Sequence, residues 1–255
     1  MNTKWAGRPL HFFQELGSTN IQAKLEAEEG AAEGTLVMAD MQTAGRGRRG
    51  RTWSSPAGVN LYFTLILKPS YGTEQASGVT LVMALAVAAG IRETCGVSAG
   101  IKWPNDIVVN GRKVCGILTE MSVEENIIRY IIIGVGVNVG LQEFPQEVAQ
   151  RATSLQAECG SEVSRDALAE NIMAAFEQYY ESFLLSGDLF GVLAEYNSLL
   201  VNRGERVRVL DPKEEYQGLA LGINARGELL VEREDGSVAE VYAGEVSVRG
   251  IDGYV

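Results

Sequence analysis

The chain has 255 residues, 46% of them hydrophobic and 22% charged, which is enough apolar material for one large domain or a large domain with a small one. Its net charge of −11 argues against nonspecific binding to nucleic acid, because phosphate binding needs lysines and arginines to displace counterions. No stretch approaches the roughly 20 apolar residues of a membrane-spanning helix, and the N-terminus lacks the apolar core of a signal peptide, so we expect a cytoplasmic protein with no membrane partner.

The cysteine and histidine content narrows the kinds of site that the chain can form. Cys95, Cys115 and Cys159 are odd in number and widely spaced, which disfavours a disulfide framework or a zinc site. His11 is the single histidine and lies in an apolar run. A multi-histidine metal site is therefore excluded, and a Ser-His-Asp triad would depend on this one residue.

Strands and helices alternate over the first 201 residues. In chain order, the pattern predicts a strand over 10–15, a helix that starts at Ser18 and ends by Gly30, strands over 35–41 and 59–68, a helix over 74–95, a short strand over 101–103, a hairpin turned at Asn110-Gly111, strands over 113–122 and 127–139, and helices over 165–185 and 189–200. In the first helix Ser18 is a candidate N-cap, and Ile21 and Leu25 share one face. The helix over 74–95 is rich in small and aliphatic residues and is expected to be mostly buried.

The pattern of predicted elements changes near Asn202, where short strands replace the alternating strands and helices. Short strands are predicted over 207–209, 218–221, 229–231 and 245–248, with turn residues between them at 224–227 and 235–236. Evenly spaced short strands indicate a small barrel of about 50 residues. We therefore predict two domains, 1–201 and 202–255.

The segment from Gly45 to Arg51, with the sequence GRGRRGR, concentrates positive charge in an otherwise acidic chain. Four arginines occur within six residues with no acidic neighbour, an arrangement that costs energy unless water or an anion compensates the charges. Glycine lets the backbone wrap closely around a ligand, and the planar guanidinium matches phosphate oxygens. The loop is therefore expected to close on a polyphosphate.

Three other interpretations of this segment compete with a polyphosphate-binding loop. Gly45, Gly47 and Gly50 fit the GxGxxG pattern of dinucleotide-binding folds, and Gly45 to Thr52 nearly fits a P-loop with arginine in place of its lysine. Both motifs require a helix directly after the loop to hold phosphate at its N-terminus, and the TWSSPAG segment that follows is not helical. A merely solvated charged loop becomes less attractive when the neighbouring motifs are counted.

Four motifs share their order and spacing with one family. They are GSTN at 17–20, QTAGRGRRGRTW at 42–53, KWPND at 102–106 and GVGVN at 134–138, with a softer match in GIL at 116–118 followed by Glu120. From about residue 10 to 140, and more loosely through the C-terminal barrel, the chain resembles the biotin–protein ligases. The resemblance implies a mixed-sheet α/β (α+β) catalytic domain of the biotin/lipoate ligase, class II synthetase-like type, followed by a small SH3-like β-barrel.

The resemblance also implies roles for individual positions. Arg48 and Lys102 are the implied catalytic residues. The implied biotin-binding positions are Ser18, Thr19, Asn20, Gln42, Gly45, Arg46, Gly47, Arg48, Lys102, Gly116, Gly134 and Gly136. The implied ATP-binding positions are Arg48, Arg51, Trp53, Lys102 and Asn138.

Elementary chemistry agrees with these roles. Short hydroxyl and amide side chains can fix a ureido ring between apolar walls, although Ser18 could serve only as a helix cap. Cations placed beforehand offset the repulsion between a carboxylate and the α-phosphate that it attacks, although a surface position remains an alternative for Lys102. Glycine weakens a strand, so Gly134 and Gly136 within a strong β-run suggest close approach of a ligand.

The implied activity is that of a biotin–[acetyl-CoA-carboxylase] ligase. Biotin and ATP with Mg²⁺ would give biotinyl-5′-AMP, and a lysine of a biotin carboxyl carrier protein would accept the biotin. The sequence assigns no magnesium ligands: Asn105 and Asp106 are candidates, but an exposed turn is an equal alternative for them. A homodimer is compatible with the family.

Two alternatives remain open at this stage. A lipoate or octanoate ligase could use the same scaffold, although the GRGRRGR and KWPND pair argues against it. A biotin-sensing transcriptional repressor would need an N-terminal winged helix, and only 16 residues precede Gly17 in the sequence given. No nucleic-acid partner is expected from this sequence.

Overall fold

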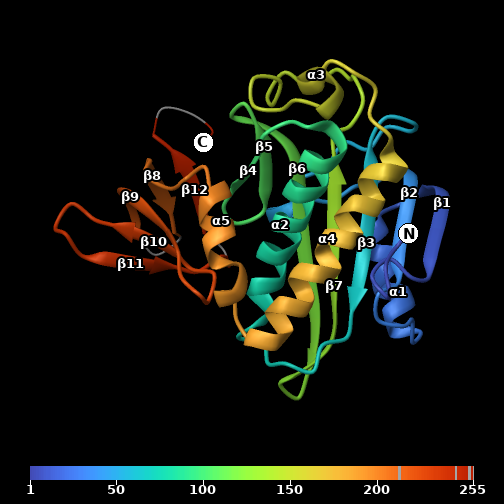
Figure 1. Cartoon of the computed structure of the whole chain (residues 1–255), viewed down its shortest axis with the longest axis horizontal. Coiled ribbons are helices and arrows are strands. Elements are labelled where there is room, and N and C mark those ends of the chain that lie inside the picture. Colours follow the sequence, from blue (N-terminus) through green and yellow to red (C-terminus); the bar gives the residue numbers. More distant parts are fainter. Residues whose placement is uncertain (212–213, 245, 252–253, 255) are drawn as a thin grey trace.

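The computed structural model describes residues 1–211, 214–244, 246–251 and 254, and folds into a large mixed sheet with helices and a smaller antiparallel sheet (Figure 1). The large sheet has seven strands in the order β1-β2-β3-β7-β6-β5-β4. Its strands are β1 (Leu10–Leu16), β2 (Leu36–Gln42), β3 (Leu61–Leu67), β4 (Ala99–Lys102), β5 (Asp106–Val109), β6 (Arg112–Glu124) and β7 (Ile127–Val137). The helical elements are α1 (Thr19–Glu28), η1 (Arg48–Gly50), α2 (Ala76–Cys95), α3 (Leu155–Cys159), α4 (Arg165–Ser186), η2 (Phe190–Val192) and α5 (Leu193–Leu199).

The strand pairing follows from the connections. β1 and β2 are parallel, because α1 carries the chain across between them, whereas the other neighbours in this sheet are antiparallel. Asn110 and Gly111 both have positive φ, at 49° and 73°, as the hairpin between β5 and β6 requires. The predicted strands and long helices of this region are confirmed. Helix α3 was missed, and the helix predicted over 189–200 is divided into η2 and α5.

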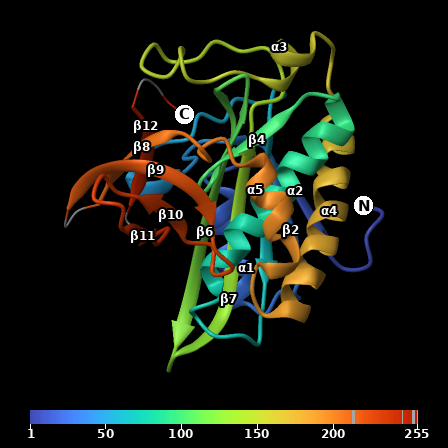
Figure 2. The same ribbon diagram turned by 60° about the vertical axis from the view of Figure 1, so that its left-hand side comes forward.

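Helices α2 and α4 lie together over one face of the large sheet, as both views show (Figures 1 and 2). Gly90 permits their close approach, since an added Cβ would lie 2.6 Å from Cγ1 of Ile172 and 2.9 Å from its backbone nitrogen. Contrary to our expectation, α2 is long and apolar enough to cross a membrane by length and composition. Its position between the sheet and α4 buries most of that surface and accounts for the composition.

Helix α1 covers part of the opposite face, and it does so with a different side from the one predicted. Ile21 and Leu25 are 45% and 49% exposed. The residues buried against β2 and β3 are Thr19, Asn20, Ala23 and Ala27. Small side chains let the helix lie close to the sheet, and this brings the two polar residues of its first turn into the interior.

The C-terminal region forms a five-stranded antiparallel sheet in the order β11-β10-β9-β8-β12. Its strands are β8 (Arg206–Leu210), β9 (Glu215–Ile223), β10 (Leu229–Glu232), β11 (Val238–Val241) and β12 (Ser247–Gly250). Strand β11 was missed, because its alternation is short and follows the Asp235-Gly236 turn. Glu245, which was assigned to the last strand, lies outside the described residues.

Trp103 connects the large sheet to the C-terminal region through buried hydrogen bonds. It is 1% exposed, its backbone N–H donates to Oδ1 of Asn202 at 2.9 Å, and its indole Nε1–H donates to the Gly227 carbonyl at 3.0 Å. The KWPND segment is therefore anchored in the seam between the large sheet and the C-terminal one. The division after residue 201 stays a prediction, since these contacts cross it.

The approach of α2 to α4 predicts that Gly90→Ala destabilises the protein. Alanine gains about 1 kcal/mol in helix propensity, but the collision with the Ile172 backbone cannot be relieved by a rotamer change and outweighs it, so we expect the free energy of unfolding to fall by about 1–3 kcal/mol. Thermal and denaturant unfolding measure this change. Ala89→Ser, on the half-buried side of the same helix, is the control, and equal stability of the two variants would contradict the packing argument.

Candidate active site

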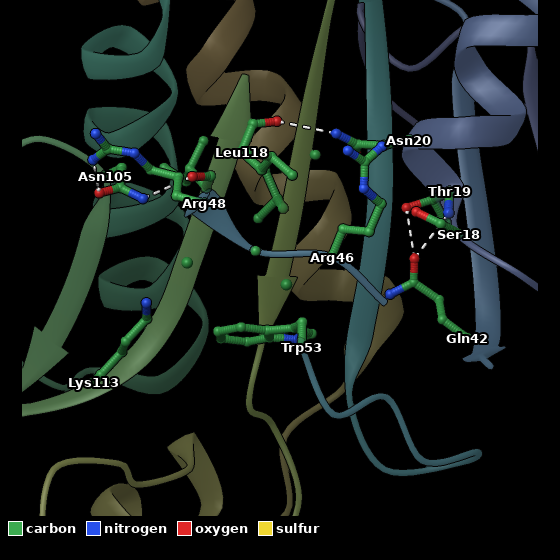
Figure 3. A pocket seen from close by; sticks show the side chains of 16 residues that line it. Ser18, Thr19, Asn20, Gln42, Arg46, Arg48, Trp53, Asn105, Lys113 and Leu118 are labelled. Atoms are coloured by element: carbon green, nitrogen blue, oxygen red, sulfur yellow. Dashed lines mark hydrogen bonds between the residues drawn. The ribbon is translucent and has the colours of Figure 1, made fainter. Parts of the chain in front are cut away.

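The first turn of α1 and the end of β2 form the polar wall of a pocket (Figure 3). Gln42 Oε1 accepts the Thr19 backbone N–H at 2.8 Å and lies 3.1 Å from the Thr19 hydroxyl. Gln42 Nε2 donates to the Ser55 hydroxyl at 2.9 Å. Ser18 occupies the N-cap position of α1, but its side chain makes no capping hydrogen bond. The hydroxyl of Ser18 therefore remains available to a ligand while its backbone starts the helix.

Thr64, in the middle of the apolar strand β3, forms hydrogen bonds with residues of this wall. Its buried hydroxyl donates to Asn20 Oδ1 at 2.7 Å and lies 2.9 Å from the Thr19 hydroxyl. The Asn20 amide in turn donates to Glu120 Oε2 at 2.8 Å and to the Leu118 carbonyl at 3.3 Å. Sequence reasoning missed Thr64, although a hydroxyl inside an otherwise apolar strand was the available signal.

The pocket floor is made of glycines on β6 and β7. Gly116 and Gly136 are cross-strand partners, and the Trp53 indole lies over both of them. A Cβ added at Gly136 would lie 2.5 Å from Trp53 Nε1. A Cβ added at Gly134 would lie 1.9 Å from Asn20 Oδ1. Glycine is required at both positions because other side chains already fill the space above the strand. Trp53 Nε1–H is buried without a partner among the described residues.

The arginine-rich loop closes one side of the pocket. Its ends are joined by a bridge between Arg46 and Thr52 and by the Gly47 N–H, which donates to the Arg51 carbonyl at 2.7 Å. Arg48 donates to Asn105 Oδ1 at 2.9 Å and to the carbonyls of Ala243 and Gly244 at 2.9 and 2.7 Å. Burial lowers the pKa of Arg48, although Asp106 opposes that shift. The loop is thereby bound to the C-terminal sheet as well as to the pocket.

Lys113 places an ammonium group in the pocket wall that sequence reasoning did not find. Its Nζ contacts Asp106 Oδ1 at 2.5 Å and lies 5.3 Å from the Trp53 ring centroid. Burial by itself would raise the pKa of Asp106, but Lys113, Tyr254 and Lys102 together offset that effect, and the pKa lies below its usual value. The Asn110-Gly111 hairpin was the available signal, because it brings Asp106 and Lys113 onto neighbouring strands.

Lys102 lies behind this wall. Its side chain is buried, and Nζ donates to the Val248 carbonyl at 2.9 Å and sits 4.6 Å from the Tyr254 ring centroid. Burial lowers the pKa of Lys102 to about 8, although Asp106 opposes the shift. The alternative of a surface lysine is therefore wrong.

Most of the predicted site residues meet in this one pocket. Those that line it are Ser18, Thr19, Asn20, Gln42, Arg46, Gly47, Arg48, Trp53, Gly116, Gly134 and Gly136. Those that do not contribute to its described lining are Gly45, Arg51, Lys102 and Asn138. Gly45 instead lies against the Trp53 backbone, where a Cβ would come within 2.4 Å of the carbonyl oxygen. Asn138 is buried, and its amide donates to the Thr153 carbonyl at 3.1 Å.

Comparison with known proteins identifies the family. Residues 13–138 match the model of the biotin/lipoate A/B protein ligase family, and residues 204–249 match the biotin protein ligase C-terminal domain. The chain is 39% identical over 251 residues to the bifunctional ligase/repressor BirA of Bacillus subtilis, covering 97% of this chain and 76% of that protein. The chain belongs to the biotin protein ligase family.

Two further relatives extend this finding. The biotin–[acetyl-CoA-carboxylase] ligase of Paracoccus denitrificans is 34% identical, with 89% of this chain and 97% of that protein covered. The structure of biotin protein ligase from Aquifex aeolicus in complex with biotin and ATP superposes with a TM-score of 0.82 at 29% identity, covering 95% of this chain and 99% of that one. The expected combination of a mixed α/β sheet with a small C-terminal SH3-like domain is confirmed.

The described residues of this biotin protein ligase offer no dedicated magnesium cage. Among them, no group of three histidine, cysteine, aspartate or glutamate side chains is placed to hold a metal. Asp106 and Asn105, which the sequence suggested, are engaged by Lys113 and Arg48 respectively. These residues do not fit a metal ion in this arrangement. Cys95, Cys115 and Cys159 are free thiols, as expected.

The buried hydroxyl under the polar wall predicts a specific cost for Thr64→Val. Valine keeps the volume but leaves Asn20 Oδ1 without its donor, which lowers the free energy of unfolding by about 1–3 kcal/mol. Chemical denaturation measures this change. Thr119→Val is the matched control, because it removes a hydroxyl from a half-buried pair with Thr80 in the same sheet, where water can substitute. Equal losses in the two variants would contradict a special role for Thr64.

Proposed function

We propose that the chain is a biotin–[acetyl-CoA-carboxylase] ligase that works in two steps. A carboxylate oxygen of biotin attacks the α-phosphorus of ATP, the bond to the β-phosphate oxygen breaks, and pyrophosphate leaves. The amine of a carrier-protein lysine then attacks the acyl carbon of biotinyl-5′-AMP, releasing AMP and losing a proton. The observation that carries this proposal is one pocket with a neutral polar wall at Thr19 and Gln42 and cationic groups at Arg48 and Lys113.

The neutral wall suits the head group of biotin. A ureido ring presents one carbonyl acceptor and two N–H donors, and Ser18, Thr19, Asn20 and Gln42 supply short side chains of both kinds. Hydrogen bonds between Thr19 and Gln42, and between Asn20 and both Thr64 and Glu120, hold three of these side chains in place before a ligand arrives. The glycines of the floor leave room above the strands for the side chains of Asn20 and Trp53, which shape the pocket. These features support biotin as the acid, as do the printed names of the relatives.

The cationic side suits the reaction centre. Two anions must meet there, and preorganised cations offset their repulsion and stabilise the charge that develops in the transition state. Arg48 and Lys113 line the pocket; Arg48 is proposed to contact the carboxylate and Lys113 the α-phosphate. Lys102 lies just behind them and contributes through its charge. Trp53, with a buried Nε1–H free of partners in the described structure, is proposed to meet the nucleotide.

The remaining ATP positions, Arg51 and Asn138, stay proposals. Arg51 would reach the nucleotide in a more closed form of the arginine-rich loop, whereas Asn138 lies outside this loop and is buried beside Thr153. Closure would exclude water from the mixed anhydride, which otherwise hydrolyses. Mg²⁺ is expected to arrive on the phosphates of ATP, which is the usual mode for this ion.

The acceptor is proposed to be the carrier domain of acetyl-CoA carboxylase, and the setting cytoplasmic. The Paracoccus denitrificans relative bears the matching ligase name. A homodimer remains a proposal. The Bacillus subtilis relative is named a repressor as well as a ligase, and the chain covers 76% of its length.

The direct test uses labelled biotin, ATP and a purified biotin carboxyl carrier domain. We expect label on the carrier lysine, dependence on ATP, and a loss of about 100- to 1000-fold in rate for Arg48→Ala, because one charged donor is removed from the transition state. Lipoate and octanoate offered in parallel should not be transferred. An unlabelled carrier, or equal use of lipoate, would overturn the assignment to biotin.

The lowered pKa of Lys102 predicts a pH dependence. The charged groups that act on the Lys102 ammonium are Asp106, which raises its pKa, and Lys113, Arg249 and Arg48, which lower it. As pH rises through about 8, the ammonium loses its proton, so kcat/KM for ATP, which reports the free enzyme, should fall. Lys102→Arg stays protonated and should lack this fall.

The exposed Lys4 provides the matched control, since Lys4→Arg makes the same change on the surface and should leave the wild-type profile intact. Thermal unfolding establishes that each variant is folded across the pH range. An unchanged fall near pH 8 in folded Lys102→Arg would assign the titration to another group.

A further inference from the structure

Tyr254 reaches back from the C-terminal region into the seam behind the pocket. Its hydroxyl donates to Asp106 Oδ2 at 2.5 Å, and its ring lies under the Lys102 ammonium at 4.6 Å. Burial and the neighbouring Asp106 raise the pKa of Tyr254 well above its ordinary value, so the phenol remains a donor at neutral pH. One side chain thus contacts both charged residues of the KWPND segment.

Asp106 links Tyr254 to Lys113, a residue that lines the pocket. Its Oδ2 accepts from Tyr254, whereas its Oδ1 holds Lys113, which lines the pocket beside Trp53. The carboxylate group is planar, so fixing one oxygen also fixes the direction in which the other presents itself. The position of Lys113 therefore depends on a tyrosine on the far side of Asp106.

A tyrosine suits this position for an electrostatic reason. An aromatic ring attracts an ammonium through its quadrupole without neutralising the charge, and a phenol satisfies a carboxylate oxygen without adding a cation. Holding Lys102 and Lys113 with a second carboxylate would cancel the positive charge that the anionic reactants need. With Tyr254, the group of two lysines and one aspartate keeps a net charge of one.

We propose that Tyr254 is a positioning residue for the phosphate side of the active site, acting through Asp106 on Lys113 and directly on Lys102. The proposal rests on the proposed function, since it assumes that the two ammonium groups serve ATP. Biotin binding, which depends on the opposite wall at Thr19 and Gln42, should not depend on Tyr254.

The test compares Tyr254→Phe, which keeps the ring and loses the hydroxyl, with Tyr254→Leu, which loses both. We expect Tyr254→Phe to weaken binding of the nonhydrolysable analogue α,β-methylene-ATP, measured by calorimetry with biotin present, by about tenfold, because a hydrogen bond to a charged group is lost. The KM for ATP in biotin-dependent pyrophosphate exchange should rise by a similar factor. Tyr254→Leu should show a larger effect, and the dissociation constant of biotin alone should change less than about twofold.

Two comparisons separate positioning from a general structural effect. Tyr216→Phe is the matched control, since its ring lies 3.9 Å from the Arg233 guanidinium in the same small sheet, away from the pocket, and it should behave as wild type. In an Asp106→Asn background, Tyr254→Phe should add little further effect, because both changes break the same chain of contacts.

Unchanged binding of the ATP analogue in Tyr254→Phe, additive effects with Asp106→Asn, or an equal loss of biotin affinity would overturn the positioning role. These results are distinct from failure of the proposed function. A wild-type chain that binds biotin and the analogue but does not exchange pyrophosphate would overturn the reaction, while the binding data would still decide the role of Tyr254.

Discussion

Positive charge gathered in a small volume must be fixed largely by neutral partners, because each added carboxylate would cancel part of it. Arg48, Lys102 and Lys113 converge behind and along one wall of the pocket, in a chain whose net charge is −11. Backbone carbonyls, an amide and an aromatic ring supply many of their contacts, and Asp106 is shared among them. Neutral acceptors fix a cation in place without cancelling its charge, so the positive potential remains available to anionic reactants.

The C-terminal region supplies neutral partners for these cations, and the seam between the two sheets therefore lies beside the pocket. The carbonyls that receive Arg48 and Lys102 belong to residues 243, 244 and 248 of the C-terminal region. Trp103, next to Lys102, is held by Asn202 and Gly227 from the same region. The small sheet therefore serves as a support for the catalytic wall as well as a separate layer of structure.

The opposite wall follows a different principle. Thr19, Asn20, Gln42 and Thr64 satisfy one another through hydrogen bonds, and the glycines of β6 and β7 leave room above the strands. A neutral, prearranged surface of this kind can select a small polar ring, whereas the cationic wall responds to charge. Trp53 lies between the two walls and contacts both the glycine floor and Lys113.

The sequence by itself determined the elements that depend on local pattern. The apolar periods of the strands, the Asn110-Gly111 hairpin and the long apolar helix were all legible, and so were the GRGRRGR and KWPND motifs that predicted a cationic site. Only the tertiary structure decided which residues meet. Lys113 and Thr64 enter the site through strand pairing, Lys102 lies behind it, and α1 turns its small residues inward because the close fit to β2 and β3 favours them over Ile21 and Leu25. The physical reason is that periodicity reports which residues avoid water, whereas contacts between distant segments depend on register and packing, which no local window of sequence contains.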